Sequence, residues 1–143
     1  MCVIVVATDG RLFLVDEYQD NEKTTEGHAL CIQALLDKWD IDFVYIDSAA
    51  AQTKHDLAMM YDISCVNAKK AKNEGISYMS SKMEHDRLLT DRRCVHAIAA
   101  FDNYRWDLRE GKTKEEPVHD DYCHMADAIR YALYTHAANI IEE

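Results

Sequence analysis

The chain has 143 residues, a formal net charge of −10 at pH 7 and five cysteines. This length suits one domain that buries its own core without disulfides. The cysteines are odd in number, scattered and without a CxxC pair, which argues against a disulfide framework and a cysteine-rich zinc site and fits a reducing cytoplasm. Because the first residues lack a basic segment and the apolar runs are short, we expect neither export nor membrane contact.

Two apolar, β-branched runs open the chain, and an Asp-Gly turn separates them. CVIVVA and RLFLVDEY on either side of such a turn predict an antiparallel hairpin. From Thr25 the apolar residues take helical spacing, with Thr24 or Thr25 as the N-cap. The inward face of this helix is predicted to hold Ala29, Ile32, Leu35, Leu36 and Trp39.

Short strands and helices then alternate. FVYID (43–47) has the composition of a buried strand, and we expect a helix from there through about Met60. ISCV (63–66) predicts the next strand, residues 71–86 predict a helix, and residues 88–89 predict one more strand. The stripe of the helix over 71–86 that faces the core should hold Ile76, Met79 and Met83.

The last third of the chain is predicted to be mostly helical. Asp91 should cap a helix, residues 107–117 form a loop or hairpin, and a closing helix runs from about Asp120 to Ile141. The inward residues of the helix after Asp91 should be Val95, Ile98 and Phe101. The order of elements predicts a single α/β domain over 1–143, with a mixed sheet that begins with the hairpin and helices packed on it.

Asp47 stands at the carboxyl end of the strand predicted over 43–47. Ligands and metals in open α/β sheets bind beyond the carboxyl ends of strands, which makes Asp47 a candidate for chemistry. The alternative is that Asp47 caps a helix beginning at Ser48 or Ala49. Position alone leaves both roles open.

HDDYCHMADAIRYAL (119–133) brings acids and a histidine to the start of an amphipathic helix. Asp120 and Asp121 suit the helix N-terminus, where negative charge is favoured. His124 and Asp127 are three residues apart and share a face, and Asp127 stands among apolar residues, where an acid must be paired, protonated or metal-bound. If Asp47 and Asp127 meet, their carboxylates with the histidine suit Mg²⁺ or Mn²⁺ and two-metal hydrolysis of phosphodiesters.

Several segments together resemble the C-terminal nuclease domain of the large terminase subunit of tailed phages and prophages. They agree with it in order and spacing, and the His124-x-x-Asp127-Ala-x-Arg-Tyr-Ala ending is the most specific when it follows a strand that ends in an aspartate about eighty residues earlier. The segments are VYIDSAA, KNEGISYMSSKMEHDRLLTDRRC, YRWD and PVHDDYCHMADAIRYAL.

The resemblance implies an RNase H-like fold and a metal-dependent endonuclease that cuts concatemeric viral DNA during packaging in the host cytoplasm. It implies Mg²⁺ or Mn²⁺ in a two-metal site, with Asp47, Asp127 and His124 as the catalytic and metal-binding residues. It also implies double-stranded DNA as the substrate, with the terminase ATPase domain, the small terminase subunit and the portal as partners.

Two features of that family have no counterpart in the sequence. The family's nuclease begins with a strand that bears a further aspartate, whereas CVIVVA matches the antiparallel partner of that strand, and no phosphate-binding loop is present. We therefore expect a nuclease domain truncated at its N-terminus, without the ATPase domain, and with an unpaired sheet edge that favours a homodimer. Glu17 and Asp121 are second-tier candidates for the site, although a solvated strand end is the favoured interpretation of Glu17.

Residues 69–93 are basic, with seven bases against four acids, in a chain that is otherwise acidic. A solvated helix face is the usual meaning of such a segment, but DNA contact is favoured here because the acids leave no other surface for it. The predicted DNA-binding residues are Lys69, Lys70, Lys72, Lys82, Arg87, Arg92 and Arg93. The alternatives to a terminase nuclease are a RuvC-like or other RNase H-like nuclease, and a catalytically silent terminase remnant that only binds DNA or protein.

Overall fold

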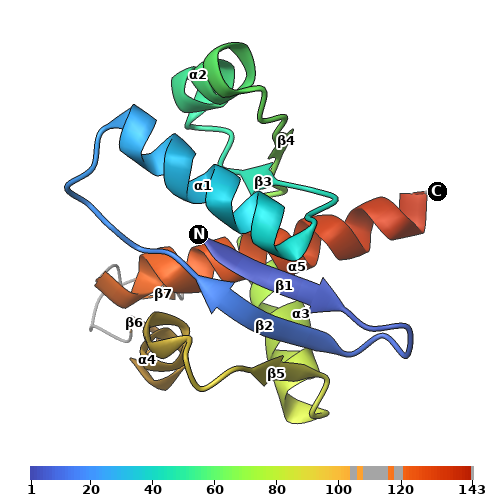
Figure 1. Cartoon of the computed structure of the whole chain (residues 1–143). Coiled ribbons are helices and arrows are strands. Elements are labelled where there is room, and N and C mark those ends of the chain that lie inside the picture. The colour runs from blue at the N-terminus through green and yellow to red at the C-terminus, as the bar shows by residue number, and fades with distance from the viewer. Residues whose placement is uncertain (104–105, 108–115, 118–120, 143) are drawn as a thin grey trace. The chain divides into compact units, whose positions relative to one another are not determined.

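The computed structural model describes residues 1–103, 106–107, 116–117 and 121–142. Its elements are β1 (Cys2–Val6), β2 (Leu12–Glu17), α1 (Thr25–Trp39), β3 (Tyr45–Ile46), α2 (Ala51–Tyr61), β4 (Val66–Asn67), α3 (Lys72–Glu84), β5 (Leu88–Thr90), α4 (Val95–Asn103), β6 (Trp106–Asp107), β7 (Glu116–Pro117) and α5 (Asp121–Glu142) (Figure 1).

Two compact units make up the structure. The first unit consists of Met1–Gln19 and Lys82–Arg130, and the second consists of Asp20–Ser81 and Tyr131–Glu143. Helices α3 and α5 each contribute residues to both units. The single domain expected over residues 1–143 stays a prediction.

The first unit begins with the expected hairpin, which is confirmed. β1 and β2 pair antiparallel, from Cys2 opposite Glu17 to Val6 opposite Leu12. The Gly10 N–H donates to the Ala7 carbonyl (2.9 Å) and closes the turn, and Gly10 has a φ of +79°. That left-handed conformation explains the glycine, because a side chain would strain it.

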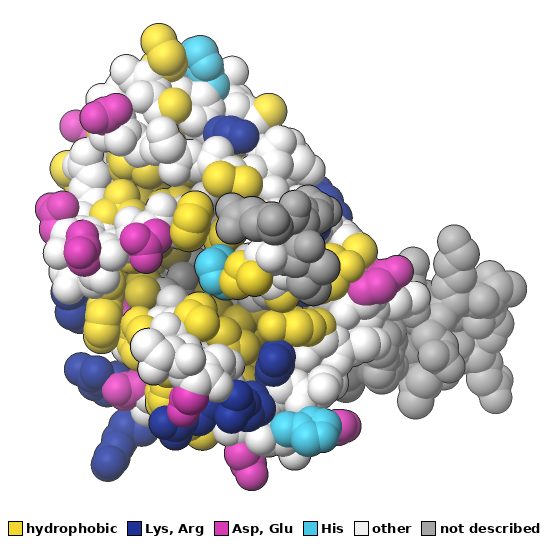
Figure 2. All heavy atoms as spheres, turned by 90° about the vertical axis from the view of Figure 1, so that its right-hand side faces the viewer, with side chains coloured by type: hydrophobic (Ala, Val, Ile, Leu, Met, Phe, Trp, Pro, Cys, Tyr) yellow, Lys and Arg dark blue, Asp and Glu magenta, His cyan; other side chains and the backbone are white. Residues whose placement is uncertain are grey.

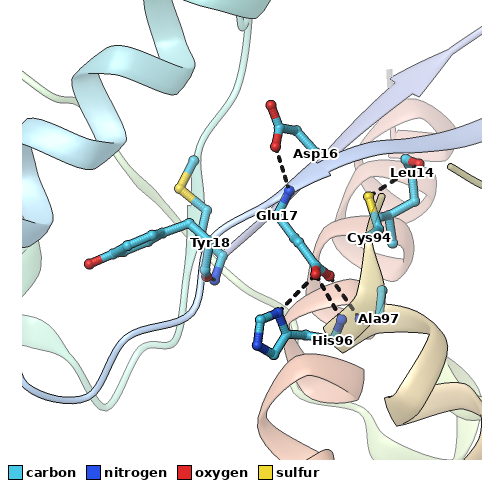
Figure 3. A network of polar contacts seen from close by, with 8 residues as sticks. Leu14, Asp16, Glu17, Tyr18, Cys94, His96 and Ala97 are labelled. Carbon is cyan, nitrogen blue, oxygen red and sulfur yellow. Dashed lines mark hydrogen bonds and ion pairs between the residues drawn. The ribbon is translucent and has the colours of Figure 1, made fainter. Parts of the chain in front are cut away.

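β5 completes a mixed three-stranded sheet in the order β1-β2-β5, since it pairs parallel with β2. The register between β1 and β2 shifts once: Val3 lies opposite Asp16 and Ile4 opposite Leu14, which leaves Val15 as an extra residue in β2. Such a bulge changes the direction of the side chains that follow it. Glu17, two residues after the bulge, points toward α4 (Figure 3).

The second unit holds a parallel pair of short strands, β3 and β4, with Tyr45 opposite Val66. Helices α1 and α2 belong to the same unit and lie near this pair in Figure 1. A hydrophobic cluster joins the strands to the two helices and anchors β3, the strand that Asp47 follows. Its buried members are Ala29, Leu57, Ile63 and Cys65, with Ile32, Leu36, Val44, Ile46 and Tyr61 packed against them.

Four predicted element details are wrong. Met83, which we expected to face the core from α3, is 40% exposed. Asp91 does not cap α4, because that helix begins only at Val95. The strand expected over 63–66 begins only at Val66, because the Ile63 N–H donates to the Leu57 carbonyl (3.0 Å) and ends α2 instead of pairing in a sheet. On α4, Val95 is exposed although we expected it to face inward. The buried residues there are the small Ala97 and Ala100, which allow α4 to pack closely.

Thr24 is the N-cap of α1, as the sequence predicts, and its hydroxyl accepts a hydrogen bond from the Gly27 N–H (3.2 Å). We expect Thr24→Ala to lower the free energy of unfolding by about 1 kcal/mol, because a helix N–H loses its acceptor. Urea denaturation followed by circular dichroism measures the change. Thr25→Ala is the matched control, and a loss of stability as large in that variant would contradict the assignment.

Among the described residues, no helix is both long enough and apolar enough to span a membrane.

Candidate functional site

Asp47 directly follows β3, and three groups of the second unit hold its carboxylate. Oδ1 accepts a hydrogen bond from the Ala49 N–H (2.8 Å) and forms an ion pair with Lys70 Nζ. Oδ2 accepts a hydrogen bond from the Tyr131 hydroxyl on α5 (3.4 Å). The Asp47 side chain is nevertheless 38% exposed, so solvent and ligands can still reach it.

The surroundings of Asp47 favour its ionised form. Burial opposes ionisation, but hydrogen bonds from Lys70, the Ala49 N–H and Tyr131 outweigh it and lower the pKa of the Asp47 carboxyl. Asp47 is not the N-cap of the following helix, because α2 begins at Ala51 and Ala50 is its cap residue. The carboxylate stabilises only the turn before α2, where the Ala50 N–H also donates to the Asp47 carbonyl (2.9 Å).

Asp127 lies in the second turn of α5, in the first unit, and its side chain is 31% exposed. Its Oδ1 accepts hydrogen bonds from Arg130 Nη2 (2.9 Å) and Nε (3.3 Å), and Arg130 is buried. Asp127 stands among apolar residues, where an acid must be paired, protonated or metal-bound, and in this structure it is paired with Arg130. His124 is exposed, one turn earlier on the same helix. Asp121 is the first residue of α5, and its side chain lies outside the described part of the structure, as does all of Asp120.

Glu17 is neither solvated nor exposed, so the solvated strand end that we favoured is wrong. Its side chain is 7% exposed, and its carboxylate meets the N-terminus of α4 (Figure 3). Oε1 accepts from the His96 N–H (2.7 Å) and lies 2.9 Å from His96 Nδ1, while Oε2 accepts from the Ala97 N–H (2.8 Å). A carboxylate at this position satisfies helix N–H groups and complements the helix dipole. We therefore assign Glu17 a structural role.

Cys94 lies next to this contact, with its thiol 3.8 Å from the Leu14 carbonyl oxygen (Figure 3). Burial raises the pKa of the Cys94 thiol to about 11 from the ordinary 9.0. The folded protein thus keeps the thiol neutral at pH values where the unfolded chain ionises. We expect stability to fall as the pH rises from about 9 to about 11, by about 3 kcal/mol in total from this group.

Thermal unfolding at pH 8 and at pH 10.5 measures the alkaline loss. Cys94→Ala should lose less stability between these two pH values than the unmodified chain does, because the variant has no thiol to ionise at this position. An equal loss in both proteins would contradict the role of Cys94.

The predicted DNA-binding residues lie in both units. Lys69, Lys70 and Lys72 belong to the second unit, and Lys82, Arg87, Arg92 and Arg93 belong to the first. Figure 2 shows Lys and Arg side chains gathered at the lower end of the face that it presents, with Asp and Glu side chains among them. Lys70 forms an ion pair with Asp47, and Arg93 forms an ion pair with Asp91. Their contact with DNA stays a prediction.

The carboxylates fit a hard divalent cation in their chemistry. Asp47 and Asp127 are partly exposed, and each forms an ion pair, Asp47 with Lys70 and Asp127 with Arg130. A divalent cation could neutralise the same carboxylates. Within the described ranges, no group of three or more His, Cys, Asp or Glu residues is arranged to hold one metal ion. Any ligand set for Mg²⁺ or Mn²⁺ is therefore a proposal.

A sequence model of the family described as the terminase RNaseH-like domain matches residues 1–135. This chain belongs to that terminase family. The terminase domain is 38% identical over 126 residues to the terminase large subunit of Escherichia phage T5. That alignment covers 86% of the domain and 29% of the phage T5 protein, so the domain spans less than a third of this relative.

Solved structures show the same RNase H-like fold. The terminase domain matches the large terminase of a thermophilic bacteriophage, in complex with ATP-gamma-S, with a TM-score of 0.81 and 21% identity over 94% of this chain and 36% of that one. It matches the g2p nuclease domain of bacteriophage SPP1, with bound Mn, with a TM-score of 0.70 and 18% identity over 92% of this chain and 75% of that one. The predicted α/β fold and the resemblance are thereby confirmed.

Sequence reasoning missed two of the groups that hold Asp47. Tyr131 follows Asp127 by four residues, which places the two on one helix face, and this spacing was the available signal. Lys70 was identified only as part of a basic segment, and nothing local to it indicated Asp47 as its partner.

Proposed function

We propose that the chain is the metal-dependent endonuclease domain of a phage terminase large subunit, which hydrolyses phosphodiester bonds of concatemeric viral DNA during packaging. Membership in the terminase RNaseH-like family supports this function. The observation that carries it is Asp47. Its carboxylate is ionised and partly exposed, directly follows a short strand that packs against the core of the second unit, and has a cationic partner on one oxygen.

Asp47 and Asp127 are the proposed metal carboxylates, with His124 beside them. His124 and Asp127 are three residues apart on α5, and this spacing supports a joint role for the pair. The SPP1 g2p nuclease domain was solved with bound Mn, which supports Mg²⁺ or Mn²⁺ as the cofactor. When bound, such ions activate a water molecule and stabilise the leaving oxygen of the phosphodiester.

The chain's own residues orient the carboxylates. The Ala49 N–H and the Tyr131 hydroxyl bind different oxygens of Asp47 and so fix the plane of its carboxylate. Arg130 holds Asp127 through a single oxygen, Oδ1, to which both its Nε and its Nη2 donate. Ligands that are already oriented lower the cost of binding an ion, because less freedom is lost.

The proposed substrate is double-stranded DNA, contacted by the basic residues between Lys69 and Arg93. The proposed partners are a terminase ATPase domain, the small terminase subunit and the portal, and the proposed location is the host cytoplasm. The relative from phage T5 supports further domains, since this chain spans only 29% of its length.

Incubation of the chain with supercoiled plasmid and Mg²⁺ or Mn²⁺ tests the function. We expect nicked and linear plasmid in the presence of metal and intact plasmid when EDTA is added. Asp47→Asn should also leave the plasmid intact. A plasmid that stays supercoiled with both metals would contradict an active nuclease, and DNA binding without cleavage would instead favour the silent terminase remnant.

A further inference from the structure

We propose that Lys70 is an internal counter-ion, which occupies Asp47 in the metal-free protein and is displaced when a divalent cation binds there. The proposal rests on the proposed function, since it takes Asp47 to be a metal ligand. It gives Lys70 a role that differs from the DNA contact expected from the basic segment.

The backbone on both sides of Lys70 explains how the side chain reaches Asp47. Lys70 lies between β4 and α3, just after two residues that are tied to neighbouring elements. The Ala68 N–H donates to the Ile46 carbonyl next to Asp47 (2.8 Å), and the Lys69 N–H donates to the Thr135 hydroxyl on α5 (2.9 Å). These two hydrogen bonds hold residues 68–69 against β3 and α5. The ammonium group of Lys70, the next residue, therefore lies beside the Asp47 carboxylate.

The contact is of the kind that a metal can replace. Lys70 and Asp47 are 42% and 38% exposed, and half-exposed ion pairs contribute little to stability. The lysine ammonium is a compact, strongly hydrated charge on a flexible stem, so it can return to water at small cost. It pairs with Oδ1, an atom that a hard divalent cation would also use.

Asp47 stays in place when Lys70 leaves. The Ala49 N–H still binds Oδ1 and the Tyr131 hydroxyl still binds Oδ2, because neither bond involves the lysine. Displacement therefore exposes an oriented carboxylate and releases a positive charge beside it. A phosphate group that approaches the bound ion would then meet an ammonium group that was previously neutralised.

Binding of Mn²⁺ to the 143-residue chain without DNA, followed by the electron paramagnetic resonance signal of free Mn²⁺, tests the proposal. We expect Lys70→Met to bind Mn²⁺ about fivefold more tightly, because the ion no longer competes with a half-exposed ion pair. Lys70→Arg keeps the charge and should bind as the unmodified chain does. Lys38→Met is the matched control: it removes an exposed lysine of α1 in the same unit and should leave the affinity unchanged.

The outcomes separate this proposal from the proposed function. If the unmodified chain and Lys70→Met bind Mn²⁺ equally, the counter-ion role is wrong while the metal site stands. If neither protein binds Mn²⁺, both ideas are wrong. If Lys70→Met binds more tightly and plasmid remains uncut, Lys70 is the counter-ion of a metal site that is not a nuclease. Tighter binding that persists in Asp47→Asn/Lys70→Met would also overturn the proposal, because the effect would not pass through Asp47.

Discussion

Asp127→Asn is expected to slow metal-dependent plasmid cleavage by about a thousandfold and to leave the fold intact. A carboxylate ligand contributes several kcal/mol to holding and using a divalent ion, and about 4 kcal/mol corresponds to a factor of a thousand in rate. The asparagine side chain keeps an oxygen that can accept the hydrogen bond from Arg130 Nη2, which is 2.9 Å long in the unmodified chain. The rate at which supercoiled plasmid disappears measures the first effect, and thermal unfolding measures the second.

Asp127→Ala separates the two roles of this residue. Alanine removes the charge and also an acceptor of Arg130, whose side chain is only 3% exposed. We expect this variant to lose cleavage as Asp127→Asn does, and to lose about 1–3 kcal/mol of stability as well. Cleavage at the unmodified rate by Asp127→Asn would show that the catalytic carboxylates lie elsewhere.

Glu17→Ala should destabilise the fold by about 3 kcal/mol without any metal being involved. The change leaves the His96 and Ala97 N–H groups at the start of α4 without their carboxylate acceptor, in a place where Glu17 itself is 7% exposed. A hydrogen bond to a charged acceptor contributes about 1.5–3 kcal/mol, out of a total stability of about 5–15 kcal/mol. Urea denaturation measures the loss.

Two further variants define the role of Glu17. Glu17→Gln keeps one oxygen acceptor and should lose roughly half as much stability as the alanine variant. Glu22→Ala removes an exposed glutamate and should change stability by less than about 0.5 kcal/mol. A loss of that small size in Glu17→Ala would mean that the contact with α4 contributes little, and Glu17 would again be a candidate for the metal site.

Elements whose signals lie within a few residues of one another could be predicted from the sequence. The hairpin follows from an Asp-Gly turn between two apolar runs, and α1 begins where Thr24 can cap it. The closing helix begins at Asp121, within one residue of the expected start. Each of these features depends on residues only a few positions apart, so spacing and residue type decide them.

The groups around the candidate acids could not be predicted in the same way. Glu17 and His96 are 79 positions apart, and the bulge at Val15 that precedes the contact has no residue signature of its own. Asp47 and Tyr131 are 84 positions apart. Sequence spacing indicated which acids stood at the ends of elements, but only the packing of distant elements determined which cations and N–H groups neutralise them.

The division of the chain between the two units has a consequence for any attempt to dissect the protein. Each unit is made of two separate stretches of chain, and two of the three crossings, between Ser81 and Lys82 and between Arg130 and Tyr131, fall inside helices. A cut at either point would break α3 or α5 and would remove part of both units. Neither unit can therefore be produced as one continuous fragment, and shortening the chain before Tyr131 would also delete the hydroxyl that binds Asp47.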